Sequence, residues 1–156
     1  MSKILPVISG EKLLADFKLG DVTQYKKQVQ EILDLMPQYQ YASGGYGYWQ
    51  NALPDPYVTA YALEVAQLAK QAGYTVPQKS LEKAAKWLEG AFNKNATRAY
   101  AYSALETDAA RAYSLYVLAL YGRNVESAFN TLYAKRGTLP LSAKAYLLKA
   151  AQASHR

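Results

Sequence analysis

Hydrophobic positions recur at helical spacing over most of the chain. In residues 22–36 they form one stripe with polar residues opposite, which predicts an amphipathic helix that ends at Pro37. One-sided patterns of the same kind follow Pro77 and Asn124. Three further segments carry apolar residues on most sides, as helices covered by protein do. These segments are 56–72, 107–121 and 139–153.

One-sided and broadly apolar helices thus alternate along the sequence. Helical hairpins stacked in two layers give this order, because an inner helix contacts both its neighbours and the middle of the assembly. We therefore predict an all-α domain over residues 22–153, either a closed α/α toroid with alternating inner and outer helices or an α-solenoid. No regular repeat period is visible, which counts against a repeat array. Residues 1–21 are predicted to be a leader segment with a short helix over 11–17, capped by Ser9.

Residues 38–53 interrupt the helical pattern with glycines and aromatic residues. Glycine permits positive φ and close backbone approach, so a tight aromatic-packed loop or small hairpin is predicted here. Its rings either pack against neighbouring helices, which we favour, or stack on a sugar or a proline. We expect Trp49, Tyr57 and Tyr61 to form a buried structural cluster that joins the loop to the next helix.

Composition removes several kinds of chemistry. The 156 residues include no cysteine and one histidine, His155, which excludes a disulfide scaffold, a cysteine nucleophile and any Cys-ligated metal. The net charge is +6, but the basic residues are spread out and form only two doublets, Lys26-Lys27 and Lys135-Arg136. This spacing favours solvated helix faces over a nucleic-acid surface. No apolar run is long enough for a membrane span, and no secretory signal is visible.

Few carboxylates are placed for catalysis. The candidates are Asp55, Glu106 and Asp108, and two of them, Asp55 and Asp108, stand where helix N-caps belong. No aspartates cluster as a terpenoid cyclase would require. We therefore predict no catalytic residue, no metal site and no cofactor. The triplet Asn95-Ala96-Thr97 matches a glycosylation acceptor, a pattern that is common by chance.

Several segments, in order, resemble the thioester domain of bacterial alpha-2-macroglobulins. Those domains carry Gly-Gly-(aromatic)-x-x-Trp, then (Trp/Tyr)-(Leu/Val)-Thr-Ala-Tyr, then Gly-Tyr-x-Val-Pro, which correspond here to segments within 44–49, 54–63 and 72–77. Segments 112–120 and 139–145 resemble later parts of the same domains, in the same order. The matching positions form a structural glycine–aromatic motif: Gly44, Gly45, Tyr46, Gly47, Tyr48, Trp49, Tyr57, Thr59 and Tyr61.

The resemblance implies an α/α toroid of six hairpins, distantly related to terpenoid cyclases. With about half of those helices, this chain is expected to form a partial, open toroid with alternating inner and outer helices. It also implies a large parent protein of the periplasm or cell envelope that traps proteases through an internal thioester at Cys-x-Glu-Gln. Because this chain has no cysteine, it is expected to be either a fragment downstream of that motif or part of a member without a thioester. Its role would be scaffolding, with the parent's other domains and, through them, proteases as partners. An α/α-toroid enzyme of the cyclase or lyase type and a peptide-binding α-solenoid are the alternatives.

The last predicted helix, 139–153, has two apolar faces, and only one can pack on the preceding hairpin. An uncovered apolar face often marks an interface. We therefore predict self-association, most simply as a two-fold dimer. The candidate surface consists of Leu141, Tyr146, Leu147 and Leu148.

Overall fold

A computed structural model describes residues 4–18, 20–93 and 108–154. The helices are α1 (Ile4–Asp16), α2 (Val22–Leu35), the 3₁₀ helix η1 (Met36–Tyr39), α3 (Pro56–Gln71), α4 (Gln78–Asn93), α5 (Asp108–Leu120), α6 (Glu126–Ala134) and α7 (Leu141–Ala153). Within these residues there is no strand, and the one β-type contact is an antiparallel bridge between Gln40 and Tyr46. The all-α prediction is confirmed.

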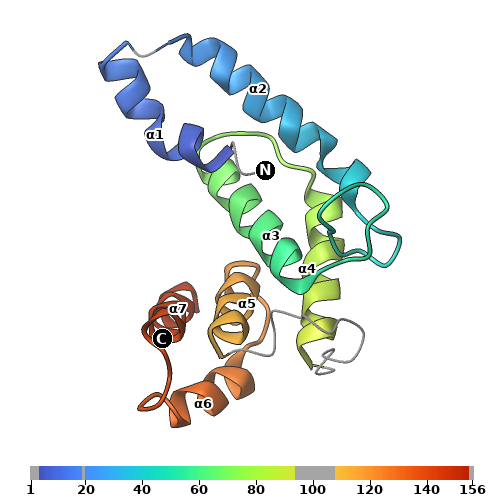
Figure 1. Ribbon diagram of the computed structural model, residues 1–156, viewed down its shortest axis with the longest axis vertical. Helices are drawn as coiled ribbons and strands as arrows, with labels where there is room; N and C mark the ends of the chain where they lie inside the picture. The colour runs from blue at the N-terminus through green and yellow to red at the C-terminus, as the bar shows by residue number, and fades with distance from the viewer. Residues whose placement is uncertain (1–3, 19, 94–107, 155–156) are drawn as a thin grey trace.

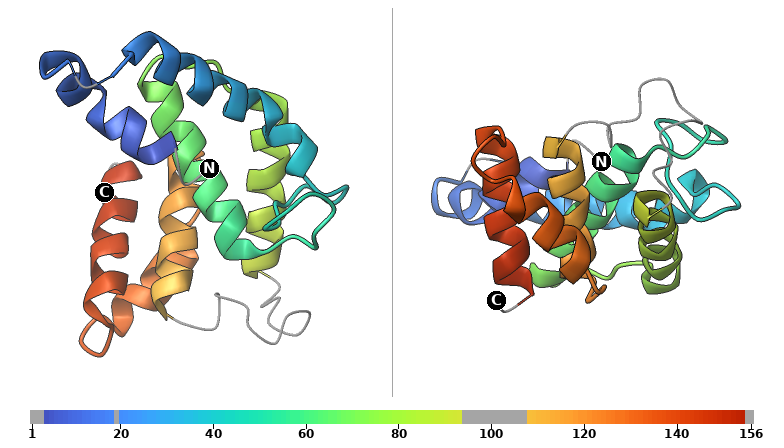
Figure 2. Two further views of the ribbon diagram at one scale, coloured as in Figure 1. Left: turned by 45° about the horizontal axis from the view of Figure 1, so that its top comes forward. Right: turned by 90° about the horizontal axis from the view of Figure 1, so that it is seen from below.

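The helices are arranged with α5 at the centre of the assembly. It packs between α3 and α7, while α4 lies against α3 and α5, and α6 lies against α5 and α7 (Figures 1 and 2). Helix α1 packs against α3, and α2 pairs with α1 (Figure 1). The middle of α5 is buried over eight consecutive residues, as its broadly apolar sequence predicts. The broadly apolar helices α3 and α5 therefore lie inside, whereas α7, which was also expected to be an inner helix, packs on α5 with one side and leaves Leu141 and Leu148 exposed.

The helix ends follow the sequence signals closely. Asp21 and Asp55 cap α2 and α3, each accepting backbone N–H groups of the first turn. Gly73 and Gly122 follow α3 and α5 with positive φ, which ends a helix at little steric cost. Asp108, which was expected to be an N-cap, is instead the first residue of α5, and its carboxylate lies 2.6 Å from Lys135 Nζ.

The N-terminal helix differs from the prediction. It begins at Ile4 and not near residue 11, so Ser9 lies inside it and is not its cap. Its first turn tolerates Pro6, because the first N–H groups of a helix have no partner within it. Ile4 is fully buried, and Glu11 pairs with Lys26 of α2 at 2.5 Å. The local sequence signals a helix only weakly here, and burial of Ile4 stabilises the additional helical residues.

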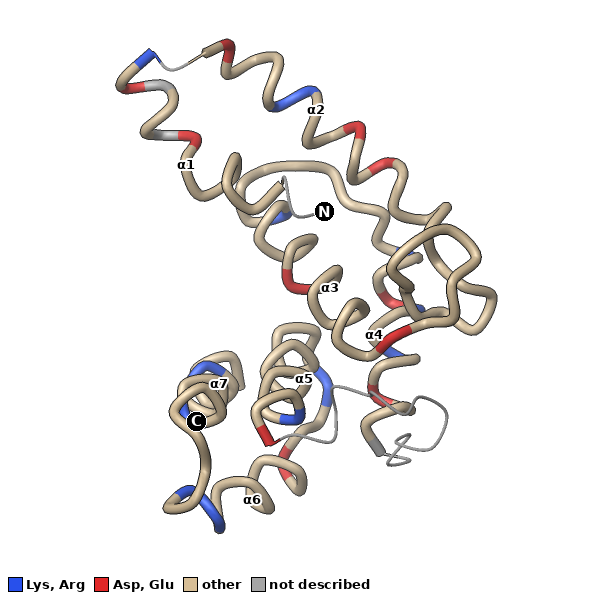
Figure 3. The backbone as a smooth tube through the Cα atoms, viewed as in Figure 1, with Lys and Arg blue, Asp and Glu red and all other residues tan. Residues whose placement is uncertain are grey.

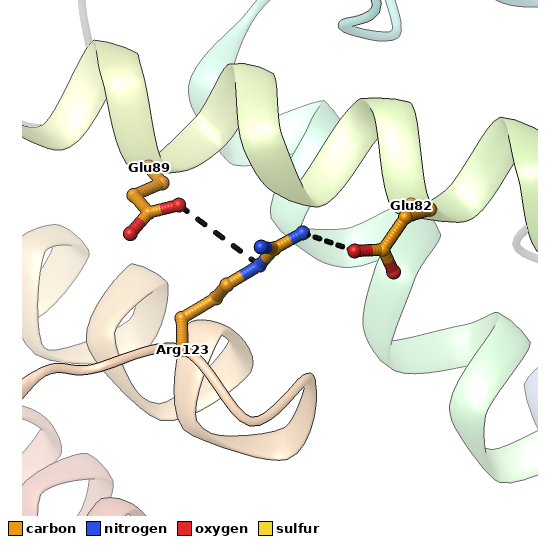
Figure 4. A network of polar contacts seen from close by, with 3 residues as sticks. All are labelled: Glu82, Glu89 and Arg123. Carbon is orange, nitrogen blue, oxygen red and sulfur yellow. Dashed lines mark hydrogen bonds and ion pairs between the residues drawn. The ribbon is translucent and has the colours of Figure 1, made fainter.

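Charged residues are distributed over all the helices (Figure 3). One of them, Arg123 in the turn after α5, reaches between two carboxylates of α4 (Figure 4). Its guanidinium lies 2.5 Å from Glu82 and 3.9 Å from Glu89, and its backbone N–H donates to Leu118. This contact fixes the α5–α6 turn against the outer helix α4.

Some sequence-based expectations concern residues that the structure does not describe. Glu106, Asn95-Ala96-Thr97 and His155 all lie outside the described residues. Among the described helices, none combines the length and apolarity that crossing a membrane requires.

Candidate functional site

The glycine–aromatic segment folds into a loop held between α3 and α4. The side-chain amide of Gln40 donates to the carbonyl oxygens of Gly44 and Ser80, both at 2.7 Å. The Ser80 hydroxyl donates back to the Gln40 amide oxygen at 2.8 Å. Gln40 therefore closes the loop on itself and ties it to the first turn of α4.

Tyr46 is the anchor of this loop. Its backbone N–H donates to the Thr59 hydroxyl at 2.9 Å, and that hydroxyl donates to the Tyr46 carbonyl at 3.2 Å. Its phenol lies 2.8 Å from the Ser80 hydroxyl, and only 1% of the residue is exposed. Burial raises the pKa of Tyr46, so the phenol stays neutral and remains a hydrogen-bond partner at physiological pH. One residue thus links the loop to both α3 and α4.

Three glycines of the loop lie where a side chain would clash. A Cβ on Gly45 would lie 2.5 Å from Pro54 Cβ and 2.7 Å from the Trp87 ring. Gly44 has φ +115°, and a Cβ there would lie 2.8 Å from the Lys83 carbonyl oxygen. A Cβ on Gly47 would meet Ala52 Cβ at 2.7 Å. The Gly-Gly-x-Gly spacing therefore serves close backbone packing against α4 and the second half of the loop.

The prediction of a buried cluster containing Trp49 is wrong. Trp49 is 68% exposed, and its ring lies beside that of Tyr48, which is equally exposed. Trp49 begins a turn in which the Ala52 N–H donates to the Trp49 carbonyl and Asn51, inside the turn, has φ +62°. The buried aromatic residue is Tyr46, which stands between glycines that let it approach the helices.

Replacing Trp49 with alanine is accordingly expected to change the free energy of unfolding by less than about 0.5 kcal/mol, as at other exposed positions. Replacing the chain's other tryptophan, Trp87, which packs on Gly45, should be clearly more destabilising. Urea denaturation followed by circular dichroism measures both variants. If both variants lost the same free energy of unfolding, Trp49 would be as buried in solution as Trp87.

Exposed aromatic residues surround a cavity between the loop, α2 and α3. Its volume is about 590 Å³, within the range of small-molecule sites, and no charged residue lines it. Tyr57 and Tyr61 both line this cavity. The lining residues are Ile32, Leu35, Met36, Tyr39, Tyr46, Gly47, Tyr48, Tyr57, Val58 and Tyr61.

A second polar cluster joins α3, α5 and α7. Glu64 of α3 accepts a hydrogen bond from the phenol of Tyr113 of α5 at 2.7 Å, and Lys149 of α7 lies 3.8 Å from it. The Tyr113 ring packs on that of Tyr146, with centroids 4.8 Å apart, and Lys149 lies 4.8 Å above the Tyr116 ring. Burial and the Glu64 carboxylate raise the pKa of Tyr113 far above its ordinary value, and that of Tyr116 to about 12. Both phenols stay protonated, so Tyr113 acts as a donor.

The sequence alone does not reveal this cluster, because its residues come from three helices that are far apart along the chain. The signal that could have found it is the single acidic residue of a broadly apolar helix, together with tyrosines on two other such helices. In the described residues there is no group of three or more acidic, histidine or cysteine side chains that could hold a metal. The arrangement supports structural linkage between helices, and the cyclase-type alternative gains no support from it.

The four residues of the candidate self-association surface separate in the structure. Leu141 and Leu148 are 83% and 63% exposed. Leu147 is 5% exposed and belongs to the core, which corrects its placement on the surface, and Tyr146 packs in the tyrosine cluster. Two of the four side chains are therefore available to a partner.

The known proteins that this chain resembles come from one family. An alpha-2-macroglobulin homolog of Yersinia pestis is 30% identical over 143 residues, which is 89% of this chain and 6% of that protein. The crystal structure of Salmonella alpha-2-macroglobulin reacted with methylamine matches 86% of this chain and 9% of its own, with TM-score 0.70 and 23% identity. Native Escherichia coli alpha-2-macroglobulin from domain MG7 to the C-terminus matches 87% and 23% of the two chains, with TM-score 0.68 and 19% identity. No protein-family model matches the chain.

These relatives confirm the resemblance read from the glycine–aromatic motif. The chain is related to a segment of bacterial alpha-2-macroglobulins and spans about 6% of the curated relative that it matches.

Proposed function

We propose that this chain is a structural portion of the thioester domain of a bacterial alpha-2-macroglobulin-like, protease-trapping protein. The observation that carries the proposal is the 30% identity to the Yersinia pestis alpha-2-macroglobulin homolog across 89% of the chain. The order of the sequence motifs supports the assignment to the thioester domain in particular. The alternation of inner and outer helices fits an open part of an α/α toroid.

The role that we propose is scaffolding without covalent chemistry and without enzymatic activity. A thioester of this family needs a cysteine, and the sequence has none. What the chain supplies is a rigid connection between helices, made by Gln40, Tyr46, Thr59 and Ser80. Its partners would be the parent's other domains and, through them, proteases in the periplasm or cell envelope.

A chimera tests this proposal. In Salmonella alpha-2-macroglobulin, a protein that reacts with methylamine, the matching segment is replaced by residues of this chain. We expect the chimera to gain mass with methylamine and to form detergent-resistant adducts with a protease. The isolated chain should do neither.

The control is the same chimera with Gly45→Val, which cannot pack its loop and should lose both reactions. A folded chimera that takes up no methylamine would contradict the scaffold assignment. A detergent-resistant protease adduct of the isolated chain would contradict the absence of covalent chemistry.

A further inference from the structure

A groove runs between α6 and α7 on the outside of the C-terminal hairpin. Its volume is about 380 Å³. Phe129 and Tyr133 form one wall with stacked rings whose centroids lie 5.8 Å apart, and the buried Leu147 belongs to the core beneath. The remaining lining residues are Arg136, Lys144, Leu148 and Ala151. The groove is an apolar channel with exposed leucine on its α7 side.

Both charged residues of the groove are basic and solvent-exposed. The Arg136 guanidinium lies 4.4 Å above the Tyr133 ring and donates to the Tyr133 carbonyl at 3.2 Å, which holds it at the rim. Lys144 is in the first turn of α7. Since Arg136 closely follows the end of α6, both cations belong to the part of the groove near the α6–α7 turn.

The surrounding hairpin has the same sign of charge. Residues 126–154 contain one acidic residue, Glu126, and four basic residues (Figure 3). Lys135 and Lys149 face carboxylates of α5 and α3. Arg136 and Lys144 can therefore pair with negatively charged groups of a partner.

We propose that this groove binds an amphipathic, acidic segment of another polypeptide. Its apolar side chains would lie against Phe129, Tyr133 and Leu148, and its Asp or Glu side chains would pair with Arg136 and Lys144. Charge complementarity of this kind selects partners and speeds association. A second copy fits poorly, because a two-fold dimer through this face brings these cations towards their own symmetry copies. Self-association, which the sequence suggested, is thus the competing outcome of the test.

The test uses a fluorescent synthetic helix of about 14 residues, long enough for partial helicity, with leucines at helical spacing and glutamates elsewhere. We expect saturable binding by fluorescence anisotropy that weakens as salt rises. Arg136→Glu with Lys144→Glu should weaken it at least about tenfold. The matched control, Lys27→Glu with Lys79→Glu, makes the same change in net charge on exposed residues of α2 and α4 and should leave affinity within about twofold.

Each contrary result overturns the proposal. Equal weakening by the control pair would mean non-specific attraction to a basic chain, and equal binding of a peptide with serines for leucines would mean that the groove is not used. Failure of the leucine–glutamate peptide to bind at about 1 mM would also refute it. The last measurement is light scattering on a gel-filtration column, which gives the oligomeric state. A dimer that becomes a monomer with Leu148→Glu would show that a second copy of the chain occupies the groove.

Discussion

Replacing Tyr46 with alanine should lower the free energy of unfolding by about 3–5 kcal/mol, the cost of removing a large buried aromatic side chain. The ring is 1% exposed, and its loss would leave a cavity between the loop, α3 and α4. The Ser80 hydroxyl would also lose a partner at 2.8 Å. Urea denaturation followed by circular dichroism measures the loss.

The control for this variant is Tyr46→Phe. It keeps the ring and removes only the hydroxyl, so we expect a loss of about 1 kcal/mol, as for one hydrogen bond. If alanine and phenylalanine cost the same, the ring would contribute nothing beyond its hydroxyl, and Tyr46 would not be the anchor of the loop.

Replacing Gly45 with alanine should destabilise the protein by about 1–3 kcal/mol or more, the usual range for overpacking a tight site. The added methyl group would meet Pro54 Cβ at 2.5 Å and the Trp87 ring at 2.7 Å. Both neighbours are stiff, a proline ring and a tryptophan, so the loop itself would have to move away from α4.

Gly90 offers a matched control, because it lies within α4 and a Cβ there would meet nothing within 4 Å. Alanine at a helical glycine is expected to stabilise by about 0.5–1 kcal/mol. Replacing glycine with alanine should therefore lower the free energy of unfolding at position 45 and raise it at position 90. A stabilising Gly45→Ala would show that the loop does not pack as the structure has it.

The sequence predicted the helices from α2 onward because their signals are local. The apolar period, the Asp55 cap and the glycines that follow the helices all act within one helix or at its ends. The start of α1 could not be predicted in this way. Its stability depends on burial of Ile4 against helices that come later in the chain.

The motif also predicted which residues form the loop, but not which ring points inward. That choice depends on Ser80 and Trp87, which lie 34 or more residues further along the chain. A single sequence gives no measure of such long-range contacts, so Trp49 and Tyr46 could not be told apart. The groove of α6 and α7 is likewise a property of packing, since only the structure separates the buried Leu147 from the exposed Leu148.

The cluster around Glu64 has a consequence for how the protein opens. Glu64, Tyr113 and Lys149 come from three helices, and the hydrogen bond between Glu64 and Tyr113 joins residues 49 positions apart. Loss of α7 would remove Lys149 from beside Glu64 and the Tyr146 ring from beside Tyr113. Fraying of the C-terminal helix would therefore cost contacts made by α3 and α5, far away in sequence. Local opening at this end is coupled to the centre of the fold, so α3, α5 and α7 behave as one cooperative unit.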